Sequence, residues 1–247
     1  MSFQFATRNR FACEQSARLA GLWRLTLLTL LPILLWDLSG WDLLVMQHLA
    51  DGRGFALRHH PWLEHGLHDA ARQVALWLYL VLWAMVWWPQ GPLRTISRSQ
   101  RAQVVLGMAL GLLLVNWLKQ QSATSCPWDL QAFGGHAQYL SHWRWGVGDG
   151  GPGHCFPGGH ASAGFAFVAL ALPWLGMSDA APRRRGMRLL GWVLMLGVML
   201  GVTQTLRGAH YISHTLWSAW LCWLAALLNH HAFVVWAHRR AQTLAVA

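Results

Sequence analysis

Long runs of hydrophobic residues, separated by shorter polar segments, dominate this chain. Six runs approach the length that a helix needs to cross a hydrocarbon core of about 30 Å. They cover residues 21–38, 70–88, 102–118, 161–177, 187–206 and 215–236. The second run is the least regular, because Arg72 lies near its start and would have to extend toward lipid headgroups. The pattern predicts an all-α, polytopic membrane bundle of six transmembrane helices, with residues 1–247 as one domain.

Composition agrees with this pattern. Of 247 residues, 55% are hydrophobic and only 11% are charged, whereas soluble domains carry about 25% charged residues. The formal net charge is +10, but all basic residues except Lys119 are arginine, and most lie in short links between apolar runs. We therefore expect contacts with lipid headgroups and no nucleic-acid partner. The first apolar run is long and flanked like a span, so we expect no cleavable signal peptide.

The distribution of arginine predicts the orientation. If the N-terminus is cytoplasmic, six spans place the C-terminus there too, together with most of the arginines in short connections. These arginines are Arg8, Arg10, Arg18, Arg94, Arg98, Arg101, Arg183, Arg184, Arg185, Arg188, Arg239 and Arg240. The opposite face then carries two long loops, 39–69 and 119–160, and one short loop, 207–214. We expect the chemistry where the last two of these loops meet.

Four residues of these loops suit a phosphate group. Lys119 offers a mobile ammonium and Arg207 a planar fork of donors. Gly158 and Gly159 allow the backbone to approach a ligand closely just before a predicted helix, whose unpaired N–H groups favour an anion. Each feature alone also fits an interfacial anchor or a simple turn, but together they predict a phosphate-binding cradle.

Two histidines supply reactivity beside this cradle. A neutral imidazole can attack phosphorus, and a second, protonated imidazole can donate a proton to the departing alkoxide. His210 and His160 are the candidates, because both lie in loops that return to the same membrane surface.

These residues resemble the type 2 phosphatidic acid phosphatase superfamily of integral-membrane lipid phosphatases, whose motifs are KxxxxxxRP, PSGH and SRxxxxxHxxxD. Lys119 is followed by six residues and then Cys126-Pro127. Pro157-Gly158-Gly159-His160 stands in the second place and His210 in the third. The order and spacing of the motifs agree over residues 119–214.

The resemblance implies that His210 is the nucleophile, His160 the general acid and Lys119 a phosphate ligand. It implies a phosphohistidine intermediate, hydrolysis or transfer of a phosphate, and no metal or other cofactor. The implied substrates are lipid phosphates at the outer leaflet of a bacterial inner membrane, with the active site facing the periplasm. Phosphatidic acid, phosphatidylglycerol phosphate, undecaprenyl pyrophosphate and lipid A phosphates remain alternatives.

Four positions depart from the family pattern. Cys126 replaces an arginine, Gly158 a serine, Gln204 a second arginine, and His214 the aspartate that would orient the nucleophile. A catalytically degenerate protein is one interpretation, and a divergent active branch is the one we favour.

Neighbouring groups could compensate for these losses. Arg207 lies three residues after Gln204 and would share its helical face. Gly158 keeps its backbone N–H for the cradle. His214 could accept a hydrogen bond from the second ring nitrogen of His210, fixing its tautomer. Asp129 or Asp149 could provide the carboxylate instead.

Cys126 and Cys155 could form a disulfide in an oxidising periplasm. Such a bridge would tie the first motif to the second and contribute about 3–4 kcal/mol by restricting the unfolded chain. Cys13 lies in the predicted cytoplasmic tail and Cys222 in the last predicted span, and neither is expected to have a special role.

Two other classes compete with a metal-free phosphatase. A zinc or haem protein is suggested by the i, i+4 spacing of His210 and His214 and by His136, His142 and His154 near His160. The outer loop after Lys119 is poor in carboxylates, which disfavours a metallophosphatase. A channel, carrier or assembly partner is disfavoured because the predicted spans hold almost no buried charge apart from Arg24. The segment from His142 to Trp145 could contact headgroups, and the sequence does not define an oligomeric state.

Overall fold

The computed structural model describes residues 2–246, with the side chains of residues 15–67, 69–240 and 242–243 placed as well. Over this part of the chain the fold is all-α, as predicted, with eight α-helices. They are α1 (Ser2–Ser39), α2 (Trp41–Leu49), α3 (Ala71–Ala84), α4 (Arg98–Gln121), α5 (Gly159–Phe165), α6 (Leu172–Leu175), α7 (Ala180–Leu206) and α8 (Ile212–Val246). The π-helix η1 (Trp62–Ala70) precedes α3, and the 3-10 helices are η2 (Gly91–Thr95), η3 (Pro127–Asp129), η4 (Gln131–Phe133) and η5 (Ala166–Leu170).

Four helical stretches are long and apolar enough to cross a membrane. They are Gln15–Ser39, Arg98–Gln121, Ala180–Leu206 and Ile212–Arg240, and they mark a multi-pass membrane protein. The other two predicted spans take different forms. Within 70–88, α3 ends at Ala84 and the chain turns before Pro89, since the residue before a proline disfavours helix. Within 161–177, the helix is divided among α5, η5 and α6.

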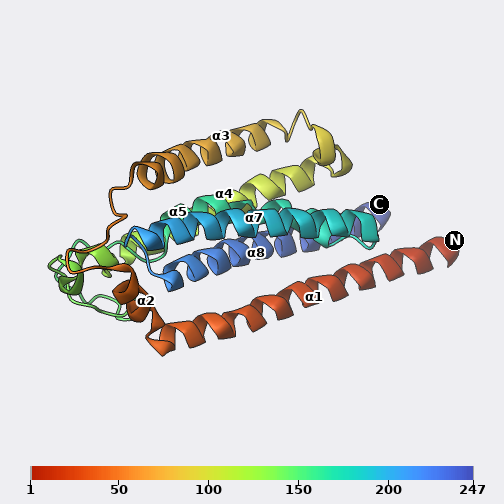
Figure 1. The fold of residues 1–247 in the computed structure, drawn as a ribbon. Helices are drawn as coiled ribbons and strands as arrows, with labels where there is room; N and C mark the ends of the chain where they lie inside the picture. Colours follow the sequence, from red (N-terminus) through yellow and green to blue (C-terminus); the bar gives the residue numbers. More distant parts are fainter. Residues whose placement is uncertain (1, 247) are drawn as a thin grey trace.

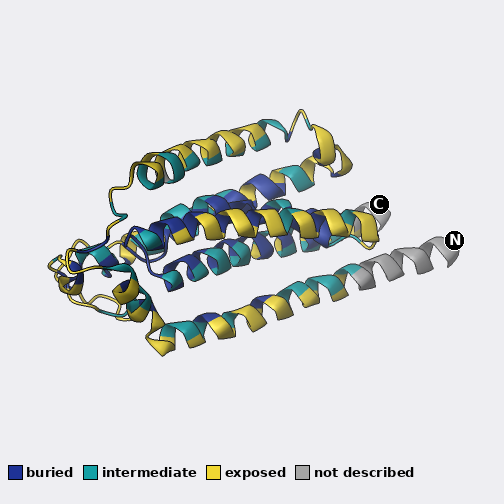
Figure 2. Cartoon of the chain, viewed as in Figure 1, coloured by how far each residue is buried: buried dark blue, intermediate teal, exposed yellow. Residues whose placement is uncertain are grey.

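The centre of the bundle is formed by α4, α5, α7 and α8, with α1 and α3 on its flanks (Figure 1). Burial is concentrated in the central helices, whereas the loops at one end of the bundle are mostly exposed or intermediate (Figure 2). The core is built from fully buried aliphatic residues such as Met108, Val168 and Leu227. Helices α5 and α7 approach closely because Gly164 faces Gly197, where an added Cβ would collide with the neighbouring helix.

Tryptophan side chains join α1 to α8. Trp217 donates its indole N–H to Asp37 at 2.7 Å, Trp220 to the Thr26 carbonyl at 3.0 Å, and Trp223 to the Thr26 hydroxyl at 2.7 Å. An indole N–H within a bundle needs such a partner. These tryptophans therefore serve as helix-helix ties, in addition to any contact with the membrane interface.

The two ends of the bundle differ in charge and in content. Both termini lie at one end (Figure 1), together with the arginine-bearing starts of α4 and α7. At this end α4 begins with a capping box, in which the Ser97 hydroxyl accepts the Gln100 N–H. The other end holds α2 and the loops that carry the predicted site.

Candidate functional site

A disulfide closes the long loop between α4 and α5. Cys126 and Cys155 are bonded, with their Cα atoms 5.1 Å apart. Two backbone hydrogen bonds hold the same junction, from His154 N–H to the Ser122 carbonyl at 2.8 Å and from Cys155 N–H to the Thr124 carbonyl at 2.9 Å. The end of α4 and the start of α5 therefore form one braced unit.

Asp149 is a structural carboxylate of this loop. It is buried, and its oxygens accept the Ser125 N–H at 2.6 Å, the Ser125 hydroxyl at 2.8 Å and the Gly151 N–H at 3.0 Å. Since its oxygens already hold the loop, Asp149 is not the carboxylate for His210. For Asp129, the second alternative, burial raises the pKa of the carboxyl, while the backbone of Cys126 and the charge of Arg58 oppose this rise.

A cavity of about 610 Å³ lies between α3, α4 and α5. Its polar residues include Lys119, Asn116, His160 and Arg72. Gly159 also lines it, and a Cβ at Gly159 would lie 3.9 Å from the Lys119 ammonium nitrogen. The structure therefore brings Lys119, Gly159 and His160 together on one cavity, whereas the other two residues of the predicted cradle, Gly158 and Arg207, do not line it.

The same cavity becomes apolar away from the loop end. Its deeper lining includes Met108, Leu112, Tyr79 and Phe167. Met108 lies eleven residues before Lys119 on α4, which corresponds to roughly 16 Å along the helix. A polar end and an apolar end in one cavity suit an amphiphilic ligand.

His210 does not line this cavity. It is only 4% exposed, and its Nδ1 is 3.3 Å from the Cys155 sulfur. The loop that carries it turns at Gly208, where φ is +75° and any Cβ would collide with Phe55. Next to His210, burial, with Tyr139 and Asp42 nearby, raises the pKa of Tyr211, so this phenol stays protonated.

His214 does not orient His210 in the predicted way. The two rings are 5.7 Å apart between centroids and tilted by 56°. His214 is fully buried, and neither of its ring nitrogens has a hydrogen-bond partner. The predicted hydrogen bond between these histidines is therefore wrong, because Nδ1 of His210 faces the disulfide instead.

The predicted role of the Gly158 amide is also wrong. Gly158 donates its N–H to the His214 carbonyl at 3.2 Å, and its own carbonyl accepts the Ser218 hydroxyl at 2.9 Å. These bonds fasten the start of α5 to α8. The amide is therefore occupied and is not directed at a ligand in the cavity.

Arg207 is engaged by the neighbouring loop. Its Nε donates to the Arg58 carbonyl at 3.0 Å, its Nη1 to Gln204 at 3.4 Å, and its Nη2 lies 3.4 Å from Glu64. It is only 4% exposed and does not line the cavity of Lys119. The positions of these donors favour an architectural role over the predicted phosphate contact.

The donor groups do not form the helical metal pair considered above. His210 precedes α8, which begins at Ile212, so His210 and His214 do not occupy successive turns of one helix. Within the described side chains, one cluster of possible metal donors comprises Cys126, Cys155 and His210. Both cysteines are oxidised in the disulfide, and a disulfide is not the thiolate ligand that zinc requires.

Sequence reasoning missed two features of this region. Arg72 was interpreted only as an anchor but lines the cavity. Asp37, inside the first predicted span, has a side chain only 2% exposed and lies 3.3 Å from His142. His142 is correspondingly buried and is not displayed to headgroups, unlike Trp143 and Trp145, which are about half exposed. A carboxylate within an apolar run was the available signal for Asp37.

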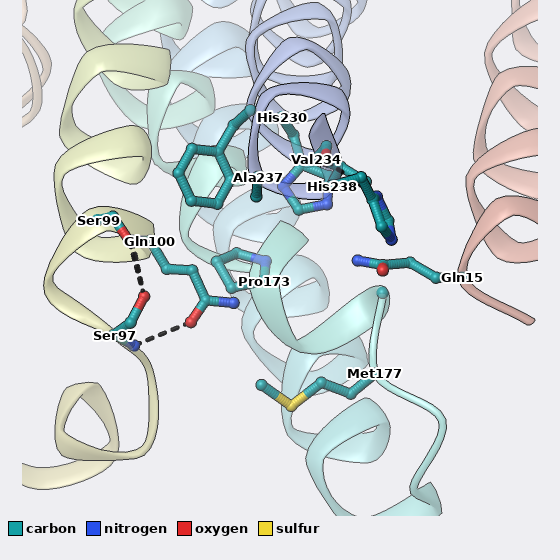
Figure 3. Close-up of a pocket in the computed structure, with 12 residues that line it drawn as sticks. Gln15, Ser97, Ser99, Gln100, Pro173, Met177, His230, Val234, Ala237 and His238 are labelled. Atoms are coloured by element: carbon teal, nitrogen blue, oxygen red, sulfur yellow. Dashed lines mark hydrogen bonds between the residues drawn. The ribbon is translucent and has the colours of Figure 1, made fainter. Parts of the chain in front are cut away.

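A second cavity, of about 330 Å³, lies at the arginine-bearing end of the bundle. Gln15 of α1, Gln100 of α4, and His230 and His238 of α8 line it (Figure 3). None of the predicted site residues contributes to it. The predicted chemistry therefore belongs to the opposite end of α4 and α8.

Comparison with known proteins gives one positive finding. A family model described as "PAP2 superfamily" matches residues 101–238, which is more than half of the chain. The matched segment includes Lys119, His160 and His210. Neither the curated proteins nor the solved structures give a match.

Proposed function

The chain belongs to the PAP2 superfamily, which implies a phosphatase-type activity on phosphate esters, and we propose that its substrate is a phosphorylated membrane lipid. The superfamily typically acts without a metal. We therefore assign a metal-independent phosphatase or phosphotransferase that forms a phosphohistidine. Residues 1–247 would constitute one membrane-embedded domain.

One observation carries this proposal: Lys119 and His160 lie at the polar end of a cavity that is apolar deeper in the bundle. A phosphate beside Lys119 would be neutralised by its ammonium, while an attached hydrocarbon chain would lie along Leu112, Tyr79 and Phe167. A small water-soluble ester would leave that apolar surface unused. The cavity lies between α3 and the central helices, so a lipid could enter sideways from the membrane.

The proposed reaction has two displacements. Nδ1 of His210 faces the Cys155 sulfur, so we assign Nε2 as the nitrogen that attacks phosphorus. As the N–P bond forms, the bond from phosphorus to the lipid oxygen breaks, and His160 donates a proton to that oxygen. Water then attacks the phosphohistidine, His160 takes its proton, and inorganic phosphate leaves. Another lipid hydroxyl or phosphate in place of water would give phosphotransfer from the same site.

The proposed location is a bacterial inner membrane with the site facing the periplasm. The arginine-bearing starts of α4 and α7 lie at the end of the bundle opposite Lys119, which supports this orientation. We retain six membrane-spanning segments as a proposal, with residues 70–88, which contain α3, as the second and 161–177, divided among α5, η5 and α6, as the fourth. Both segments run alongside the four long helices (Figure 1).

The test is phosphate release in detergent from the four lipid classes named above. The parent protein should release phosphate from at least one of them. His210→Ala should abolish the release, and His160→Ala should lower kcat by about 10²–10⁴, the usual contribution of a general acid. Replacing the alkyl leaving group by an aryl one, which needs less protonation, should restore most of the loss in His160→Ala but none of the loss in His210→Ala.

A labelled intermediate gives an independent readout. Brief reaction with ³²P-labelled lipid should leave an acid-labile label on the parent and none on His210→Gln. Ser162→Ala is the matched control, because Ser162 also lines the cavity but donates its hydroxyl to the Gly159 carbonyl. An acid-stable label that disappears in Ser162→Ala would refute the proposal, as would equal phosphate release by the parent and His210→Ala.

A further inference from the structure

A carboxylate outside the family segment lies next to the histidines of the site. We propose that Asp37, near the end of α1, is a positioning residue for His210 and acts through His142 and His214. The inference rests on the proposed function. It assigns to Asp37 the negative charge that is missing at position 214, where the family pattern has aspartate and this chain has histidine.

Asp37 is held in a closed environment. Its side chain is 2% exposed, and Oδ2 accepts the indole N–H groups of Trp217 at 2.7 Å and Trp143 at 3.3 Å. His142 Nε2 lies 3.3 Å from the same oxygen. A carboxylate in such surroundings retains its charge only with donors or cations beside it. The two indoles and His142 provide that support.

His142 connects Asp37 to the centre of the site. Its ring stacks on Phe156, with centroids 4.0 Å apart and planes within 7°. Its edge meets His214, with centroids 5.7 Å apart. Phe156 directly follows Cys155, whose sulfur contacts His210. Stacking therefore fixes the plane of His142, and Asp37 fixes the direction of its Nε2.

His214 completes the connection to His210. It contacts both histidines at the same centroid separation, 5.7 Å. Both ring nitrogens of His214 and Oδ1 of Asp37 are buried without a hydrogen-bond partner, whereas Nε2 of His142 is engaged in the ion pair with Oδ2 of Asp37. Buried polar atoms are normally paired. The rings of His142, His214 and His210 therefore form a series of contacts from Asp37 to the site.

Other charged and titratable groups around His214 are accounted for. His210, His142 and Lys119 are the cationic or titratable neighbours, and Tyr211 packs against the ring as a protonated phenol. Asp42 accepts the Trp36 indole and the Ser213 N–H, and Asp149 holds its own loop. Among the described ion pairs of carboxylates with histidine, only that of Asp37 joins a histidine in contact with His214.

The charge has a defined effect on the reaction. The imidazole ring of His210 becomes cationic when Nε2 bonds to phosphorus while Nδ1 still carries a proton. A fixed negative charge behind the packed rings of His142 and His214 stabilises this cation more than it stabilises the neutral ring. Asp37 should therefore affect kcat and leave substrate binding almost unchanged.

The test is a double-mutant cycle on lipid phosphate hydrolysis with Asp37→Asn, His142→Phe and both together. Asparagine keeps an oxygen for the indoles but removes the charge, and phenylalanine keeps the stack on Phe156 but removes the ring nitrogens. Each single variant should lower kcat at least tenfold per folded molecule, with KM within twofold. The double variant should lose no more than the worse single variant, because both changes interrupt one connection.

Asp42→Asn is the matched control, since Asp42 is also a buried carboxylate that accepts an indole N–H and contacts α8. Its kcat should stay within threefold of the parent. The inference is overturned if Asp37→Asn or His142→Phe retains the parental kcat per folded molecule, or if the two losses multiply in the double variant. An inactive parent would instead refute the proposed function itself.

Discussion

The two regions joined by residues 155–160 have opposite characters. In one region lies the cavity with Lys119 and His160, large enough for a ligand and apolar at its deeper end. In the other region lie His210 and His214, both at most 4% exposed, with aromatic rings and a disulfide packed around them. The comparison separates two tasks. Groups that receive a substrate need access, whereas groups that hold a nucleophile in one orientation need close packing.

The segment between the two regions must keep them in register. Its start is fixed by the disulfide, and Gly158 is bonded to α8 through His214 and Ser218. A small shift of this segment would move His160 relative to His210. Variants of Lys119, of the Cys126–Cys155 disulfide and of Arg72 therefore test this division of tasks.

After the two histidine variants described above, the largest effect is expected at Lys119, in the cavity. Lys119→Ala removes the ammonium beside Gly159 and should lower kcat/KM by about 10²–10³, as loss of one transition-state donor usually does. Lys119→Arg is the control that keeps the charge and should retain more activity. The measurement is steady-state phosphate release. If Lys119→Ala kept the parental kcat/KM, Lys119 would not contact the substrate in the transition state.

Removal of the Cys126–Cys155 disulfide should have a smaller effect on activity and should first lower the stability of the fold. Cys126→Ser/Cys155→Ser should lower the free energy of unfolding by about 3–4 kcal/mol, because the unfolded chain is no longer restricted. For a protein of this size that corresponds to roughly 6–15 °C in Tm. Thermal unfolding in detergent measures the shift, and Cys13→Ser is the control. An unchanged Tm would show that the hydrogen bonds at the junction suffice.

The smallest effect is expected at the mouth of the cavity. Arg72 is exposed and lines the cavity, so Arg72→Gln should raise KM for an anionic lipid about two- to fivefold with kcat unchanged. This range corresponds to about 0.5–1 kcal/mol, the upper part of the roughly 0.2–1 kcal/mol typical of an exposed charge pair. Arg53→Gln, on an exposed loop residue outside the cavity, is the control. Equal KM values in Arg72→Gln and the parent would place the headgroup elsewhere.

Most of the helical content could be predicted from the sequence. Long apolar runs define α4, α7 and α8 because a membrane helix must be apolar over its whole length. The ends of the helices in the α3 and α5 segments were harder to predict, because local breaks such as the turn before Pro89 depend on backbone details that hydrophobicity does not encode. For the site, the motif spacing predicted that Lys119 and His160 lie close together, and both line one cavity, while their chemical roles stay predictions.

The orientation of side chains could not be predicted. The sequence offered Arg207, Gly158 and His214 as compensating groups, but the structure directs the first toward Glu64, bonds the second to α8 and leaves the ring of the third without a partner. Long-range contacts decide these outcomes. Asp37 lies 105 positions before His142 in the chain, so no local pattern could join them.

The ties between α1 and α8 bear on where this protein can be shortened. The family match begins at residue 101, yet Trp217, Trp220 and Trp223, all inside it, donate to Asp37 and Thr26 outside it. A fragment trimmed to the match would leave three indole groups facing lipid without acceptors. Truncated forms and chimaeras of this protein should therefore carry the first helix, because the family match begins inside the unit that packs together.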